Sequence, residues 1–134
     1  MEKRIVDLAK YRLQRGKEML KDAEMLLAHG SYKSALNRTY YAVFHAARAL
    51  LATKELDSRK HKGVVSLFNK HFVKTGLMDK RFSKILSEAK DLREDSDYDD
   101  FYLIDEEEVK KDFQNCKDFI KEVERVVPEL LESK

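Results

Sequence analysis

The chain has 134 residues, of which 27 are basic and 25 are acidic, so its formal net charge is only +2. This length fits one domain over residues 1–134, and the charge balance does not by itself indicate a nucleic-acid binder. The single Cys116 excludes an intramolecular disulfide and a two-cysteine metal site, so we expect a reducing, cytoplasmic location. No window approaches the roughly 18 apolar residues of a membrane span, and we expect no membrane association.

The first predicted helix covers about residues 3–29, because apolar or small residues recur there every three or four positions. Gly30 is suited to the left-handed residue that follows a helix. Ser31 can cap the next helix directly. We therefore expect a tight antiparallel hairpin with almost no loop between its helices.

The second predicted helix, from Ser31 to Lys54, is apolar on nearly all sides, which is typical of a helix enclosed by others. One of its faces carries only small side chains, which would let a neighbouring helix or a second copy come close: Ala35, Ala42, Ala46 and Ala49. A polar stripe with helical spacing runs between the apolar faces: Arg38, Tyr41, His45 and Arg48. Buried cations and imidazoles cost free energy unless they are paired.

A third helix is predicted over about residues 60–74, with Asp57 or Ser58 as its cap and Gly76 in the turn after it. Asp79 begins a fourth helix. Arg93 continues the apolar face of that helix, so its guanidinium group is predicted to point inward.

Residues 95–104 lack a clean period, and we interpret them as an ordered, acidic loop. A fifth helix is predicted from Asp105, because three glutamates follow in its first turn, and Pro128 is expected to end or kink it. No segment has the pattern of a strand. The sequence therefore predicts an all-α, up-and-down bundle of about five helices.

Three groups of residues are candidates for a functional site. Arg38, Tyr41 and His45 either form a hydrogen-bonded seam between helices or bind a phosphate beside an acid–base histidine. His61 and Lys62 are either a solvated helix start or an anion site at a helix N-terminus.

The third group is Arg93, Asp97 and Tyr98, which is either a structural ion pair beside an acidic loop or part of a binding site. The acidic run Asp97, Asp99 and Asp100 lacks the spacing of an EF-hand, so no metal site is predicted. The chain also lacks a glycine-rich phosphate loop and paired Cys/His spacings, and we expect no cofactor.

Three segments carry a resemblance to a known family: NRTYYAVFHAARALL at 37–51, KHKGVVSLFNKHF at 60–72 and LREDSDYDD at 92–100. Together they are similar to the HEPN superfamily of small α-helical domains. The match is best to its compact prokaryotic branch, which is found beside minimal nucleotidyltransferases. The resemblance covers nearly the whole chain, and it implies a five-helix domain that forms a homodimer.

The resemblance also implies that the chain is the HEPN half of a toxin–antitoxin-like pair with a minimal nucleotidyltransferase, and that it binds nucleotide or RNA. Many such domains are metal-independent endoribonucleases with an R-x4-6-H motif, in which histidine is the acid–base group and arginine stabilises phosphate charge. Here Arg93 is followed by Glu94, and Tyr98 stands where the histidine is expected. Arg38 and His45 also fit R-x6-H, but they lie in the second helix.

These observations lead to one main hypothesis and one alternative. The main hypothesis is a dimeric binding module that presents Arg93, Tyr98, His45 and Arg38 in one cleft, with Tyr41, His61, Lys62 and Asp97 as further binding residues. The alternative is an active endoribonuclease that uses Arg93 with Tyr98, or Arg38 with His45. A purely structural dimer is a third reading of the same polar stripe.

Overall fold

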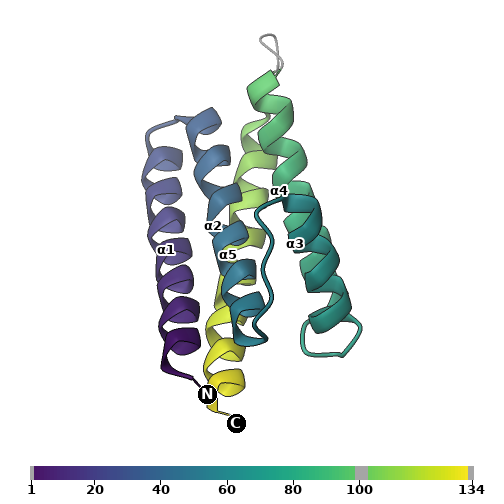
Figure 1. The fold of residues 1–134 in the computed structure, drawn as a ribbon. Helices are drawn as coiled ribbons and strands as arrows, with labels where there is room; N and C mark the ends of the chain where they lie inside the picture. Colours follow the sequence, from purple (N-terminus) through teal and green to yellow (C-terminus); the bar gives the residue numbers. More distant parts are fainter. Residues whose placement is uncertain (1, 99–102, 133–134) are drawn as a thin grey trace.

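The computed structural model describes residues 2–98 and 103–132, and every regular element in this part of the chain is helical. The elements are α1 (Lys3–Ala28), α2 (Tyr32–Thr53), α3 (His61–Phe68), the π-helical segment η1 (Asn69–Val73), α4 (Lys80–Tyr98) and α5 (Glu106–Glu132). Figure 1 shows α1, α2, α4 and α5 running up and down beside one another. The shorter helix α3 packs against α2 and α4. The predicted all-α, up-and-down bundle of five helices is confirmed.

Helix α2 is the centre of this bundle, because it contacts α1, α3, α4 and α5. Fourteen of its residues are buried, which explains why its sequence is apolar on nearly all sides. The four alanines of its small-residue face are fully buried. Helix α1 approaches this face through Gly16, where an added Cβ would lie 2.8 Å from the carbonyl oxygen of Ala42. A neighbouring helix of the same chain therefore occupies the alanine face.

The turns agree with the predicted helix ends. Gly30 and Gly76 have φ angles of 75° and 82°, in the left-handed region that favours glycine. The carboxylate of Asp79 accepts a hydrogen bond of 2.8 Å from the backbone nitrogen of Arg81, and Asp105 accepts one of 3.0 Å from that of Glu107. Both aspartates therefore cap helices as predicted.

The start of the third helix differs from the prediction. Lys60 occupies the N-cap position of α3, and no side chain makes a cap hydrogen bond there. Asp57 instead accepts charge-assisted hydrogen bonds from Arg48 and Arg12, and its Oδ1 atom also accepts one of 2.8 Å from the backbone nitrogen of Ser58. Ser31 likewise precedes α2 without a side-chain cap bond.

The predicted loop over residues 95–104 is also partly wrong, because α4 continues to Tyr98. Ion pairs four residues apart support its last turns: Lys90 Nζ lies 3.2 Å from Glu94, and Arg93 Nη1 lies 3.1 Å from Asp97. Residues 99–102, which include Asp99 and Asp100 of the acidic run, lie outside the described part of the chain.

Pro128 does not end the last helix, since α5 runs to Glu132 with Pro128 inside it. The partly buried Leu130 and Leu131 pack on the core and hold this final turn in place. None of the described helices is both long and apolar enough to cross a membrane.

Candidate functional site

The side chain of Arg93 lies where α4 meets the middle of α2. Its Cζ atom is 4.7 Å from the ring centroid of Tyr40 and 5.8 Å from that of Tyr41. The side chain is only 16% exposed, so it points inward as its helical position predicts. One nitrogen, Nη1, donates to Asp97, whereas the buried Nε has no hydrogen-bond partner in the described part of the chain. Stacking on two rings thus holds a cation whose donors are not all used.

His61, the first residue of α3, also contacts Tyr40, with ring centroids 5.6 Å apart. Its Nδ1 atom is 3.3 Å from the Tyr40 hydroxyl oxygen, within hydrogen-bond distance. The His61 ring also stacks on Phe44, with centroids 6.4 Å apart and an interplanar angle of 17°. Helices α2, α3 and α4 therefore bring one guanidinium, one imidazole and two phenols together. We call Tyr40, Tyr41, His61, Arg93 and Asp97 the Arg93 cluster.

Burial shifts the pKa of two members of the Arg93 cluster, Tyr40 and His61. Burial raises the pKa of Tyr40 to about 12, although the charge of Arg93 opposes this change. Burial also lowers the pKa of His61, and the charge of Lys90 acts in the same direction. Near neutral pH, Tyr40 is therefore a neutral phenol and His61 a neutral imidazole, while Arg93 carries the positive charge. Such a set can bind an anion through Arg93 and exchange a proton through His61.

Tyr41, His61, Arg93 and Asp97 are thus brought together as candidates for one site. Lys62 is exposed in the first turn of α3, directly after His61. Tyr98 is the last residue of α4 and is 81% exposed. It makes no hydrogen bond or ring contact with Arg93 among the described residues.

His45 belongs to a different neighbourhood. Burial lowers its pKa, and the charges of Arg48, Arg15 and Arg12 add to this effect. His45 therefore lies near the guanidinium groups of Arg12 and Arg15 on α1 and of Arg48 in the second half of α2. Arg38 is exposed. Within the described residues, no hydrogen bond, ion pair or ring contact joins either side chain to Arg93. The convergence of Arg38, His45 and Arg93 on one pocket or on a dimer seam therefore stays a prediction.

Near His45, Asp57 forms an ion-pair cluster with Arg12 and Arg48 that the sequence does not indicate. Asp57 accepts bonds of 2.9 Å from both Nε and Nη2 of Arg48 and one of 3.0 Å from Arg12. The hydrogen bond from Arg48 is the main reason that the pKa of Asp57 falls to about 2. Arg12 also donates to the backbone carbonyl of Arg48 at 3.2 Å. No sequence spacing indicates this cluster, because Arg12 and Asp57 are 45 positions apart.

Tyr40 is not among the residues that the sequence pattern singles out, although its ring and hydroxyl join His61 to Arg93. The signal that could have indicated it is the tyrosine pair itself, since a buried tyrosine hydroxyl usually finds a partner. That the partner is His61 follows only from the packing of α3 on α2.

Comparison with known proteins agrees with this architecture. The sequence model of the HEPN domain matches residues 9–127. A UPF0332 protein of Thermotoga maritima is 36% identical over 123 residues, covering 92% of this chain and 93% of that protein. A Methanocaldococcus jannaschii chain named "Putative toxin MJ0605" is 33% identical and covers 85% of this chain and 84% of its own. A UPF0332 protein of Archaeoglobus fulgidus is 31% identical, with 91% and 97% covered. This chain therefore belongs to the HEPN domain family.

Proposed function

We propose that this chain is the HEPN component of a toxin–antitoxin-like pair, that its partner is a minimal nucleotidyltransferase, and that it acts as a homodimer binding nucleotide or RNA. The observation that carries the proposal is the Arg93 cluster. A guanidinium with an unused buried donor is suited to a phosphate, and the partly exposed ring of Tyr41 beside it is suited to stacking with a base. The toxin names of two relatives from Methanocaldococcus jannaschii support the same assignment.

Two exposed cations lie close in sequence to members of the Arg93 cluster. Lys62 follows His61 in α3, and Arg38 lies one turn before Tyr41 on α2, so both can contribute to phosphate binding from exposed positions. Asp97 limits the positive charge by pairing with Arg93 at 3.1 Å. An incoming phosphate would compete with this carboxylate for Nη1. Binding is therefore expected to weaken as salt concentration rises.

The Arg93–Tyr98 form of the endoribonuclease alternative fits a site shared between two copies of the chain. On one helix, Asp97 faces Arg93 because it is four positions away, whereas Tyr98 is rotated by a further 100° or so. The highly exposed Tyr98 is therefore directed away from Arg93 of its own helix and is accessible to an arginine of a second copy. His45 and Arg38 provide the other pair, one turn to either side of Tyr41, with the low pKa of His45 suited to a general base.

Binding to single-stranded RNA and to ATP, measured by fluorescence anisotropy and calorimetry, tests the main proposal. Arg93→Ala should weaken binding by at least about tenfold, and Arg93→Lys should recover only part of it, because lysine keeps the charge but loses the planar stacked group. The matched control is Arg81→Ala, since Arg81 lies on the same helix and stacks on Phe82 at 4.5 Å, away from the cluster. Equal losses for Arg93→Ala and Arg81→Ala would contradict a site at Arg93.

Partnership and catalysis need separate measurements. Light scattering on the chain alone should give a dimer, and coexpression with the nucleotidyltransferase of a neighbouring reading frame should give a stable complex. A monodisperse monomer without nucleotide binding and without a complex would overturn the proposal. Cleavage of tRNA or mRNA by the chain, lost in Arg93→Ala, Tyr98→Phe or His45→Ala, would favour the endoribonuclease alternative instead.

A further inference from the structure

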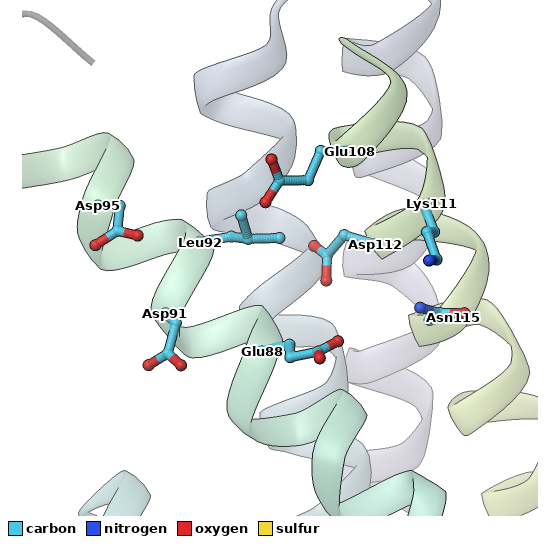
Figure 2. Close-up of a pocket in the computed structure, with 8 residues that line it drawn as sticks. All are labelled: Glu88, Asp91, Leu92, Asp95, Glu108, Lys111, Asp112 and Asn115. Atoms are coloured by element: carbon cyan, nitrogen blue, oxygen red, sulfur yellow. The ribbon is translucent and has the colours of Figure 1, made fainter. Parts of the chain in front are cut away.

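A cavity of about 340 Å³ lies between α4 and α5, and acidic side chains dominate its walls. Figure 2 shows Glu88, Glu108 and Asp112 directed into the space between the two helices, with Leu92 at its centre. Asp91 and Asp95 stand on its α4 rim. The charged residues that line it are these five carboxylates and Lys111, and Glu88 also pairs with Lys84 on α4 at 3.7 Å. The cavity is strongly acidic, although the whole chain is nearly neutral.

One of these carboxylates lacks the partners that a buried charge requires. Asp112 is 6% exposed, and its Oδ2 atom is buried without a hydrogen-bond partner among the described residues. Its Oδ1 atom lies 3.8 Å from the Cys116 thiol, which is a weak donor. Burial, reinforced by the charges of Glu88 and Glu108, raises the pKa of Asp112 to about 7. An unpaired carboxylate held inside a cavity is expected to have a cationic or hydrogen-bond-donating ligand.

The arrangement of the carboxylates selects the class of cation. Within the described residues, no group of three or more His, Cys, Asp or Glu side chains is placed to hold a metal ion. Instead, Glu88, Asp91 and Asp95 extend over seven positions of α4, which at about 1.5 Å per residue is roughly 10 Å. Glu108 and Asp112 extend over roughly 6 Å of α5. The negative charge is therefore distributed along the cavity.

We propose that the α4–α5 cavity binds a linear aliphatic polyamine, with one ammonium group hydrogen-bonded to Asp112 and another held between Glu88 and Glu108. Ammonium groups separated by methylene chains match carboxylates that are several ångströms apart. Leu92 provides an apolar surface for the methylene groups. The volume is at the lower end of the range for small-molecule sites. This site uses a different face of α4 from the Arg93 cluster, and it does not depend on the function proposed above.

Calorimetry of the full chain with spermidine and with butane-1,4-diamine tests the proposal. We expect saturable binding to one site, and affinity for butylamine should be at least about tenfold weaker, because it has a single ammonium group. Asp112→Asn and Glu108→Gln should each reduce the affinity for spermidine at least about tenfold. The control is Glu107→Gln, which removes the same charge from the adjacent, exposed residue and should change the affinity less than about twofold.

Three outcomes would overturn the proposal. The first is the absence of saturable heat with either amine. The second is an equal loss of affinity in Glu107→Gln and Glu108→Gln, which would indicate diffuse attraction to the acidic surface. The third is displacement of spermidine by Mg²⁺ as effectively as by the diamine at matched ionic strength. If Asp112→Asn does not fold, the comparison of Glu108→Gln with Glu107→Gln still decides the question.

Discussion

Asp112 should make the stability of this chain depend on pH in a way that one isosteric substitution removes. Burial is the main cause that raises its pKa from 3.8 to about 7; the Cys116 thiol opposes this, and Glu88 and Glu108 add to it. Each pKa unit is worth about 1.4 kcal/mol, so the ionised carboxylate costs about 4 kcal/mol in the folded chain.

The sign follows from which state holds the proton. Between about pH 4 and about pH 7, the folded chain keeps the Asp112 proton, whereas the unfolded chain has released it. The free energy of unfolding should therefore fall as pH rises through this range and then level off. Asparagine has the same shape and no titratable proton. Asp112→Asn should match the natural chain near about pH 4 and exceed it by about 4 kcal/mol at about pH 8.

Urea unfolding followed by circular dichroism at several pH values measures this difference. Subtracting the two chains at each pH cancels the titrations that they share. Asp91→Asn is the control, because Asp91 is exposed on the rim of the same cavity and should show no such trend. A difference between Asp112→Asn and the natural chain that stays constant across the pH range would refute the reasoning, since Asp112 would then titrate as a solvated group.

Two further substitutions test the packing of α1. Gly16→Ala should lower the free energy of unfolding by about 1–2 kcal/mol, because the added Cβ would lie 2.8 Å from a backbone oxygen of α2. This strain exceeds the gain in helix propensity. An unchanged or higher urea midpoint would contradict the close approach of α1 to α2. Asp57→Asn should cost about 1 kcal/mol at neutral pH, since the Asp57 side chain is 43% exposed and solvent weakens its ion pairs. Because Arg48 lowers the pKa of Asp57 to about 2, this cost in unfolding free energy should be present above about pH 4 and disappear as pH falls through about 2. A cost that persists in acid would show that the ion pair is not its source.

The fold could be predicted from the sequence where burial is periodic along one helix. Helix α2 is buried over most of its length, as its apolar composition predicts, and Gly30 and Gly76 mark turns through their backbone freedom. The prediction failed for residues 95–98, where no apolar period exists. There the helix is supported by ion pairs four residues apart, and a dense acidic segment obscures such pairs in a sequence.

The candidate site is harder to predict from the sequence than the fold, because its contacts join residues that are distant along the chain. Arg93 and Asp97 are close in sequence and were recognised together, but Tyr40 and His61 reach Arg93 only through the packing of α2, α3 and α4. The sequence pattern does not indicate that Asp112 is buried either. It lies beside the apolar stripe of α5, and its burial depends on how closely α4 approaches.

The polar stripe of α2 shows why equal spacing does not imply a shared role. Tyr41 and His45 are one turn apart, and a helical projection places them on the same face. Helix α4 brings Arg93 to Tyr41, whereas the charges that act on His45 come from Arg12, Arg15 and Arg48. A single stripe therefore serves two neighbourhoods, because two different helices cover it. In the RNA-binding assay, a strong effect at Arg93 with a weak effect at His45 would reflect this division, whereas equal effects would mean that bound RNA spans both.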